Sequence, residues 1–135
     1  MEDNAQMILL DTHALVWLRA EPARLSPAAS EAIRVARQTD GLAISAITLW
    51  ELAWLATHGR LHATGTVDAF VEKIASTIAI RPITTQIAVL ANQLPSTYPG
   101  DPSDRLIGAT ALAEGIPLVT KDRSIRNCRQ IKTIW

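Results

Sequence analysis

The sequence predicts an α/β fold in which a parallel sheet is covered by helices on both faces. Short, continuous apolar runs at residues 7–10 and 42–44 are typical of strands that are buried on both faces. Longer segments with helical character follow these runs along the chain. Strands that alternate with helices favour a parallel sheet, because each parallel pair needs a long crossover connection.

Helix start and stop signals set the boundaries of the expected elements. Ser26 and Asp101 each precede a proline, and a capping residue followed by proline is typical of a helix N-terminus. Ser45 can cap the helix after the second strand, and Gly59 can end that helix. Together these signals predict strands at residues 7–10, 42–44, 77–83 and 118–119, an edge strand within 130–135, and helices at 14–18, 28–38, 46–58, 67–76, 86–94 and 102–113.

Composition narrows the classes of protein that fit this chain. With 135 residues, 48% of them hydrophobic and 19% charged, the chain suits one globular domain, which we expect at residues 7–135 after a disordered extension at 1–6. Thirteen basic residues balance thirteen acidic ones, so any nucleic acid must be held by local charge. Cys128 is the single cysteine, which excludes an internal disulfide. No apolar stretch approaches the roughly 18 residues of a membrane span, and we expect a cytoplasmic protein.

Four acidic residues fall near the ends of the expected strands. Asp11 follows the first strand, Asp122 follows the fourth, and Asp104 lies in the first turn of the helix that leads to the fourth. Glu51 lies in the second turn of the helix after the second strand. Parallel strands bring their carboxyl ends to one edge of the sheet, and crowded carboxylates need a compensating cation. We therefore expect a site for Mg²⁺, or Mn²⁺ in its place, that serves phosphoryl chemistry.

The segments around these acids resemble the motifs of PIN-domain ribonucleases, and within that family the VapC-type toxins of bacterial toxin–antitoxin pairs. They are residues 9–13, 45–53, 100–107 and 118–122, and their order and strand context match. The resemblance implies a three-layer PIN-like fold with five parallel strands in the order 3-2-1-4-5. It also implies a homodimer, an antitoxin partner, and catalytic, metal-binding roles for Asp11, Glu51, Asp104 and Asp122. Residues 96–100 and Ser103 depart from the family pattern, which bears on the preference for substrate or partner.

Polar residues beside the acids have two interpretations. Asp101 is expected to cap its helix and to support the metal ligands from behind rather than to bind the metal directly. Three hydroxyl residues stand at strand ends: Thr12, Ser45 and Thr120. Each can either cap a helix or orient an acid or bound water, and the sequence does not decide between these roles. His13 is expected to be a satisfied polar residue rather than a base.

Basic and aromatic residues suggest contacts beyond the acids. The last fifteen residues carry five basic residues against one acid, and we expect the members nearest the site to bind RNA phosphates: Lys121, Arg123, Arg126 and Arg129. Trp50 and Trp54 lie one helical turn apart. Their place in the core, in a dimer contact or in an antitoxin contact is left open by the sequence.

The sequence as a whole predicts a Mg²⁺-dependent endoribonuclease that hydrolyses RNA phosphodiester bonds, as the toxin of a toxin–antitoxin pair and without membrane contact. A non-toxic PIN-domain nuclease, acting in RNA processing or on structured DNA, remains an alternative. A receiver-like phosphoacceptor module fits poorly, because it needs paired acids after the first strand and an acceptor aspartate after the third. A haloacid-dehalogenase-like phosphatase needs Asp-x-Asp, and His13 stands where its second aspartate would be.

Overall fold

A five-stranded parallel sheet forms the centre of the molecule. The computed structural model describes residues 7–135, so the extension expected at residues 1–6 lies outside the described residues. The strand order is β3-β2-β1-β4-β5, and every pair of neighbouring strands is parallel. The predicted fold class and strand order are therefore confirmed. The strands are β1 Ile8–Leu10, β2 Leu42–Ser45, β3 Ala79–Arg81, β4 Leu118–Val119 and β5 Thr133–Ile134.

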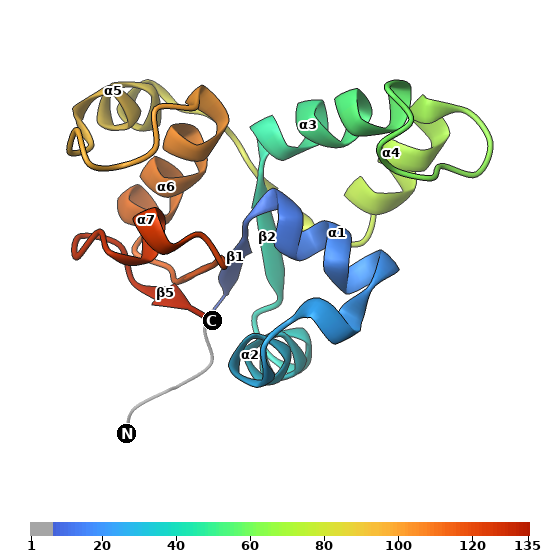
Figure 1. The fold of residues 1–135 in the computed structure, drawn as a ribbon, viewed down its shortest axis with the longest axis horizontal. Helices are drawn as coiled ribbons and strands as arrows, with labels where there is room; N and C mark the ends of the chain where they lie inside the picture. Colours follow the sequence, from blue (N-terminus) through green and yellow to red (C-terminus); the bar gives the residue numbers. More distant parts are fainter. Residues whose placement is uncertain (1–6) are drawn as a thin grey trace.

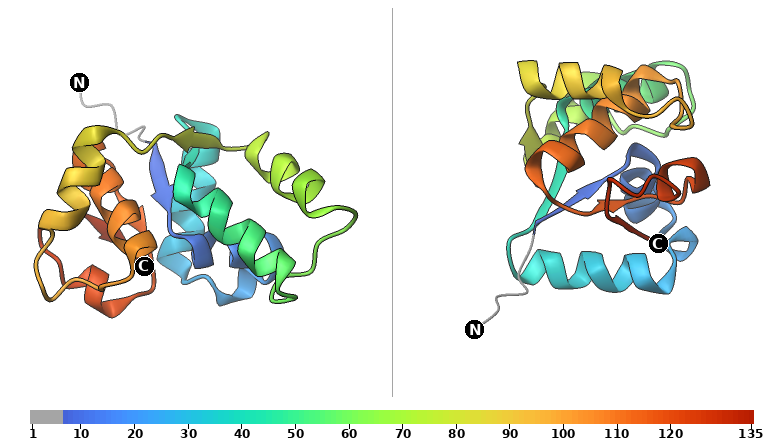
Figure 2. Two further views of the ribbon diagram at one scale, coloured as in Figure 1. Left: turned by 90° about the horizontal axis from the view of Figure 1, so that it is seen from above. Right: turned by 90° about the vertical axis from the view of Figure 1, so that its left-hand side faces the viewer.

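Helices cover both faces of this sheet, so the three layers are as predicted (Figures 1 and 2). The side view in Figure 2 shows α2 on one side of the sheet and α5 with α6 on the other. No helix within residues 7–135 is both long and apolar enough to cross a membrane. The helices are α1 Thr12–Ala20, the 3₁₀ turn η1 Pro22–Arg24, α2 Pro27–Gln38, α3 Ala46–Thr57, α4 Val67–Ala75, α5 Thr85–Gln93, α6 Pro102–Glu114 and α7 Arg123–Arg126.

Alternate side chains of the central strand β1 point into two different cores. Ile8 and Leu10 pack with side chains of α1, α2 and β2, whereas Leu9 packs with side chains of α6, β4 and α7. All three residues are buried. A strand buried on both faces has no polar side to alternate with, which explains the continuous apolar run in the sequence.

Several segments differ from the expected elements. Helix α1 spans Thr12–Ala20 rather than 14–18, and η1 was not predicted. The third strand is shorter than the predicted 77–83, because the Thr77 hydroxyl bonds the Ile74 carbonyl at the end of α4 and Pro82 has no N–H to extend the ladder. The edge strand spans only Thr133–Ile134 of the expected 130–135. The segment directly after Asp122 forms the short helix α7, which contains Arg123 and Arg126 and which the sequence analysis did not predict.

Candidate active site at the carboxyl edge of the sheet

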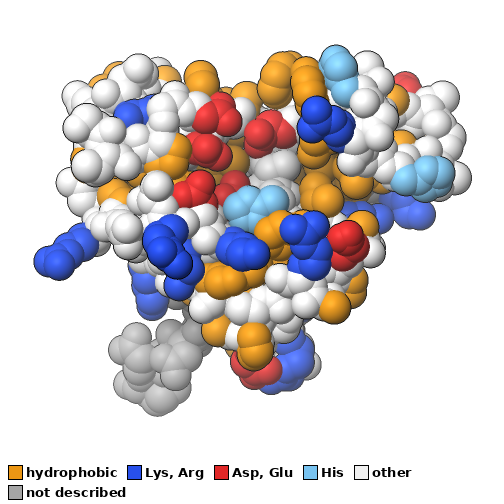
Figure 3. Space-filling view, in the orientation of Figure 1, with side chains coloured by type: hydrophobic (Ala, Val, Ile, Leu, Met, Phe, Trp, Pro, Cys, Tyr) orange, Lys and Arg blue, Asp and Glu red, His pale blue; other side chains and the backbone are white. Residues whose placement is uncertain are grey.

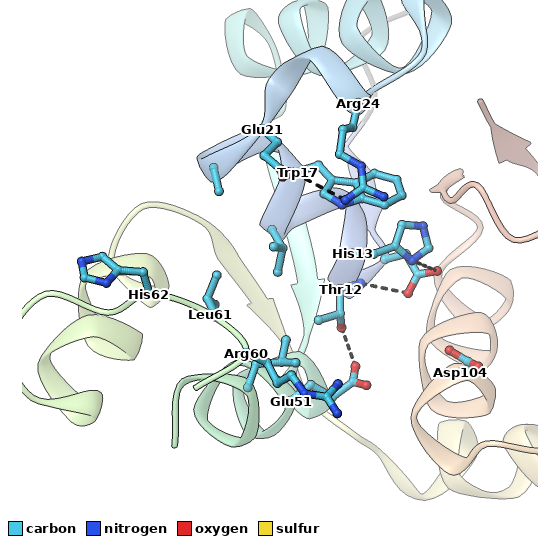
Figure 4. A pocket seen from close by; sticks show the side chains of 14 residues that line it. Thr12, His13, Trp17, Glu21, Arg24, Glu51, Arg60, Leu61, His62 and Asp104 are labelled. Atoms are coloured by element: carbon cyan, nitrogen blue, oxygen red, sulfur yellow. Dashed lines mark hydrogen bonds and ion pairs between the residues drawn. The ribbon is translucent and has the colours of Figure 1, made fainter. Parts of the chain in front are cut away.

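A pocket of about 560 Å³ lies beside the end of β1, between α1, α3 with the loop after it, and the first turn of α6 (Figure 4). Asp11, Glu51 and Asp104 line it, so the fold brings together three of the four predicted acids from separate parts of the chain. Asp122 is not among the lining residues, but its charge helps to raise the pKa of Asp104. In the space-filling view, acidic side chains gather in a central hollow with Lys and Arg side chains along one side (Figure 3).

Asp11 is held by hydrogen bonds at both carboxylate oxygens. It follows β1, is 3% exposed, and caps α1 through Oδ1, which accepts the Thr12 N–H at 2.9 Å. The Thr120 hydroxyl donates to Oδ2 at 2.7 Å. The same hydroxyl oxygen accepts the N–H of Asp122 at 3.1 Å. Thr120 therefore orients Asp11 and links it to the turn that carries Asp122.

His13 connects the first turn of α1 to the segment after β4. Its Nε2 accepts the backbone N–H of Lys121 at 3.2 Å, so in the neutral ring the proton is on Nδ1. That Nδ1 lies 3.5 Å from Oδ2 of Asp11. Both ring nitrogens thus have partners, as expected for a satisfied polar histidine. The contact with Lys121 spans 108 positions and had no signal in the sequence.

Glu51 is positioned by two threonines. The Thr12 hydroxyl donates to Glu51 Oε1 at 2.5 Å (Figure 4). The Thr48 hydroxyl lies 3.0 Å from the Thr12 oxygen. The Thr12 hydroxyl has one hydrogen, which it donates to Glu51, so in the contact between the two threonines Thr48 is the donor and Thr12 the acceptor. Burial raises the pKa of Glu51, and the charges of Asp11 and Asp101 add to that rise. Thr48 was missed by the sequence analysis, although it stands three residues before Glu51 on the same face of the helix.

Asp104 lies in the first turn of α6, where it is half-buried. Burial raises its pKa from 3.8 to about 7, and the charges of Asp11, Asp101 and Glu51 add to the effect. The Tyr98 hydroxyl donates to the backbone carbonyl of Asp104 at 2.8 Å, so the preceding loop is attached to this turn. Asp101 caps α6 as predicted, by accepting the Ser103 N–H at 3.1 Å.

The donor chemistry of the four acids fits a hard divalent cation. All of their donor atoms are oxygen, and no Lys or Arg of the described chain forms an ion pair with them. Within residues 7–135, however, no three acidic, His or Cys side chains lie close enough to form a ready-made ligand cluster. Asp122 instead caps α7 by accepting the Ile125 N–H at 3.1 Å. Like charges repel, which opposes a closer approach of the carboxylates to one another.

The predicted RNA-binding residues lie outside the acidic pocket. Arg123 and Arg126 line a separate hollow beside Trp135. The arginines that line the acidic pocket are instead Arg24 and Arg60. Arg24 is the last residue of η1 and Arg60 lies in the chain after α3, where sequence spacing carries no information about the cavity they face. None of the predicted basic residues is buried: Lys121, Arg123, Arg126 and Arg129 are all exposed.

Burial and contacts bear on two questions that the sequence left open, the role of Ser45 and the location of Trp50 and Trp54. Ser45 is completely buried and caps α3 by accepting the Ile47 N–H at 3.2 Å. No hydrogen bond joins it to an acid in the described chain, so capping is the interpretation that the contacts support. Trp50 is 60% exposed and Trp54 38%, which removes both from the core.

The family model of the PIN domain matches residues 8–130. The chain belongs to the PIN-domain family. This PIN domain is 46% identical over 130 residues to Ribonuclease VapC22 of Mycobacterium tuberculosis, a match that covers 95% of this chain and 98% of that protein.

Solved structures share the fold at lower identity. One is VapBC2 from Rickettsia felis bound to a promoter DNA fragment, with a TM-score of 0.71, 16% identity, and coverage of 95% of this chain and 97% of that one. Another is DNA-bound VapBC from Salmonella typhimurium, with a TM-score of 0.68, 23% identity and coverage of 96% of both chains. These likenesses show the fold of this PIN domain.

Replacing Asp104 by Asn should stabilise the metal-free PIN domain at pH 8. Because the pKa of Asp104 is raised to about 7 in the folded protein, the folded state binds more protons than the unfolded state between about pH 4 and 7. The free energy of unfolding of the parent protein therefore falls as the pH rises through this window. The amide side chain of the variant does not titrate, so the variant does not lose this stability. Allowing for solvent screening, we expect a gain on the order of 1 kcal/mol at pH 8 and almost none at pH 4.

Urea unfolding in EDTA at both pH values measures this difference. Asp101→Ala is the matched comparison, since it removes a neighbouring carboxylate that caps α6 and should cost about 1 kcal/mol. Equal destabilisation by the two substitutions at pH 8 would show that Asp104 is a structural residue.

Proposed function

We propose that this PIN domain is an endoribonuclease that needs a divalent cation, Mg²⁺ or Mn²⁺, and hydrolyses RNA phosphodiester bonds. The observation that carries the proposal is the meeting of Asp11, Glu51 and Asp104 in one pocket without a Lys or Arg ion pair in the described chain. The 46% identity to a protein named as a ribonuclease supports it. The proposed metal ligands and catalytic residues are Asp11, Glu51, Asp104 and Asp122.

Hydrogen bonds from surrounding groups hold these carboxylates in place for the proposed reaction. A divalent cation, when bound, neutralises phosphate charge and activates water for attack on phosphorus. Thr120 and the Thr12 N–H hold both oxygens of Asp11, so its orientation is set before substrate arrives. The Thr48–Thr12 pair holds Glu51, which we propose binds the metal or positions the attacking water. The cap from Asp101 stabilises the turn that presents Asp104.

RNA, an antitoxin and a second copy of the chain are the proposed partners of the enzyme. Four exposed basic residues near the end of β4 provide positive charge for RNA phosphates: Lys121, Arg123, Arg126 and Arg129. The exposed Trp50 and Trp54 are available for a protein contact. Action on cellular RNA as a toxin would place the enzyme in the cytoplasm.

Cleavage of purified RNA by the purified protein tests this proposal. We expect cleavage with Mg²⁺ or Mn²⁺ and none with EDTA, and sequencing of RNA ends after brief expression should give discrete cleavage positions. Co-expression of the protein encoded by a small neighbouring gene should suppress those ends if the enzyme is a toxin. Undiminished cleavage in EDTA would contradict the proposed mechanism.

A further inference from the structure

Two arginines at the wall of the acidic pocket each lie near a tryptophan ring. The guanidinium of Arg24 is 4.3 Å from the centre of the Trp17 ring, and that of Arg60 is 6.0 Å from the centre of the Trp54 ring. Both arginines line the pocket that contains Asp11, Glu51 and Asp104. They come from different segments, Arg24 from η1 and Arg60 from the chain after α3, and Figure 4 draws them on different sides of Thr12.

These arginines have few competing partners. Among the described residues, Arg24 forms an ion pair only with Glu21, at 3.5 Å, and both side chains are more than half exposed, so the pair is weak. Arg60 forms no ion pair in the described part of the chain. A guanidinium on an aromatic face keeps its edge N–H groups free to donate, and stacking reduces the side-chain freedom lost on binding.

A polyanionic substrate can bind beside these carboxylates only if positively charged side chains stand close by. The carboxylates of the acidic pocket repel phosphate, and the net charge of the whole chain is zero, so no general attraction brings RNA to the site. The exposed basic residues after β4 can attract the RNA chain, but a cation at the pocket itself is what places a phosphate beside the acids. Arg123 and Arg126 line a different hollow, whereas Arg24 and Arg60 line this one.

We propose that Arg24 and Arg60 bind phosphates of single-stranded RNA on two sides of the acidic pocket, with Trp17 and Trp54 as the surfaces that hold them in place. Trp17 is the stronger support, since Arg24 lies closer to its ring than Arg60 lies to that of Trp54, and His13 packs against Trp17 at 4.8 Å. Trp54 is covered on one side by His58, whose ring stacks on it at 4.0 Å. This inference rests on the proposed function, because it names how the RNA is held.

RNA binding as a function of salt tests the proposal. The variants are compared in an Asp11→Asn background, which is expected to prevent cleavage during the measurement, with a fluorescently labelled single-stranded RNA and anisotropy as the readout. Arg24→Gln and Arg60→Gln should each weaken binding several-fold at low salt and reduce the slope of log K against log salt by about 0.7. Arg37→Gln, at an exposed position on α2, makes the same change of charge elsewhere and should leave the slope unchanged.

Arg24→Lys separates the stacked geometry from the charge. It keeps the charge but loses the planar contact with Trp17, so the slope should be kept while binding weakens. Slopes for Arg24→Gln and Arg60→Gln equal to that of Arg37→Gln, or no RNA binding by the parent protein, would overturn the inference. If the unsubstituted protein fails to cleave RNA while binding still depends on Arg24 and Arg60, the proposed function fails and the inference stands.

Discussion

Asp11→Asn and Asp104→Asn should each lower kcat for RNA cleavage by at least about a hundredfold at saturating Mg²⁺. Each substitution removes a negative charge that we propose holds the cation, and the amide leaves the shape of the side chain almost unchanged. Both oxygens of Asp11 accept hydrogen bonds, one from the Thr12 N–H and one from the Thr120 hydroxyl. Asn has only one acceptor oxygen, so one of these two bonds is lost or reversed. Initial rates on a defined RNA, measured against Mg²⁺ concentration, give both kcat and the apparent metal affinity.

The control for this loss is Asp40→Asn, the same chemical change at an exposed acid in the turn after α2. It should leave the rate within about twofold of the parent, as expected for a surface substitution away from the site. The effects of Asp104→Asn on stability and on activity should have opposite signs, because it is expected to stabilise the metal-free protein while it lowers kcat. A rate for Asp104→Asn close to that for Asp40→Asn would remove Asp104 from the proposed metal site.

Gly108→Ala should destabilise the protein by about 3 kcal/mol and lower its Tm by about 10 °C. A methyl group at Gly108 of α6 would overlap the Tyr98 hydroxyl and stand only 2.7 Å from Tyr98 Cζ and 3.2 Å from Ile131 Cδ1. Tyr98 is buried and tied to the carbonyl of Asp104, so its ring cannot move aside freely. Glycine to alanine inside a helix otherwise adds stability of up to about 1 kcal/mol, so the sign of the change tests the close contact.

Gly100→Ala is the matched control for this substitution. No atom lies within 4 Å of the methyl group it would add, and we expect a change within about 0.5 kcal/mol. Thermal unfolding followed by circular dichroism compares the two variants. Stability of Gly108→Ala equal to that of Gly100→Ala would show that Tyr98 is not packed as closely against α6 as the structure has it.

Arg105 explains why the loop before α6 is difficult to displace. Its guanidinium donates to four backbone carbonyls of the chain from α5 to this loop, at 3.1 Å to Ala91, 3.3 Å to Leu94, 3.3 Å to Pro95 and 3.4 Å to Tyr98. The carbonyls at the end of α5 thereby gain the partners that a helix C-terminus lacks. Asp104 and Arg105 are therefore neighbours with different tasks, one at the acidic pocket and one in the support behind it.

The local sequence alone determined the fold class and the places of the acids. The buried strands appear as apolar runs, and caps such as Ser26, Ser45 and Asp101 mark helix starts, because burial on both faces and helix capping act over a few neighbouring residues. A parallel sheet then brings its carboxyl ends to one edge, and this predicted that Asp11, Glu51, Asp104 and Asp122 converge; the first three line one pocket and Asp122 does not. No knowledge of side-chain packing was needed for that step.

The tertiary structure decided the contacts that tune and surround these acids. The hydrogen bond from Thr12 to Glu51 joins residues 39 positions apart, and that from Thr120 to Asp11 joins residues 109 apart. Arg24 faces the pocket because η1 returns the chain over Trp17. Such contacts have no sequence period, since they depend on how whole elements pack against one another. The same packing leaves Trp50 at the surface, because the opposite face of α3 supplies the buried Thr48 and Leu52.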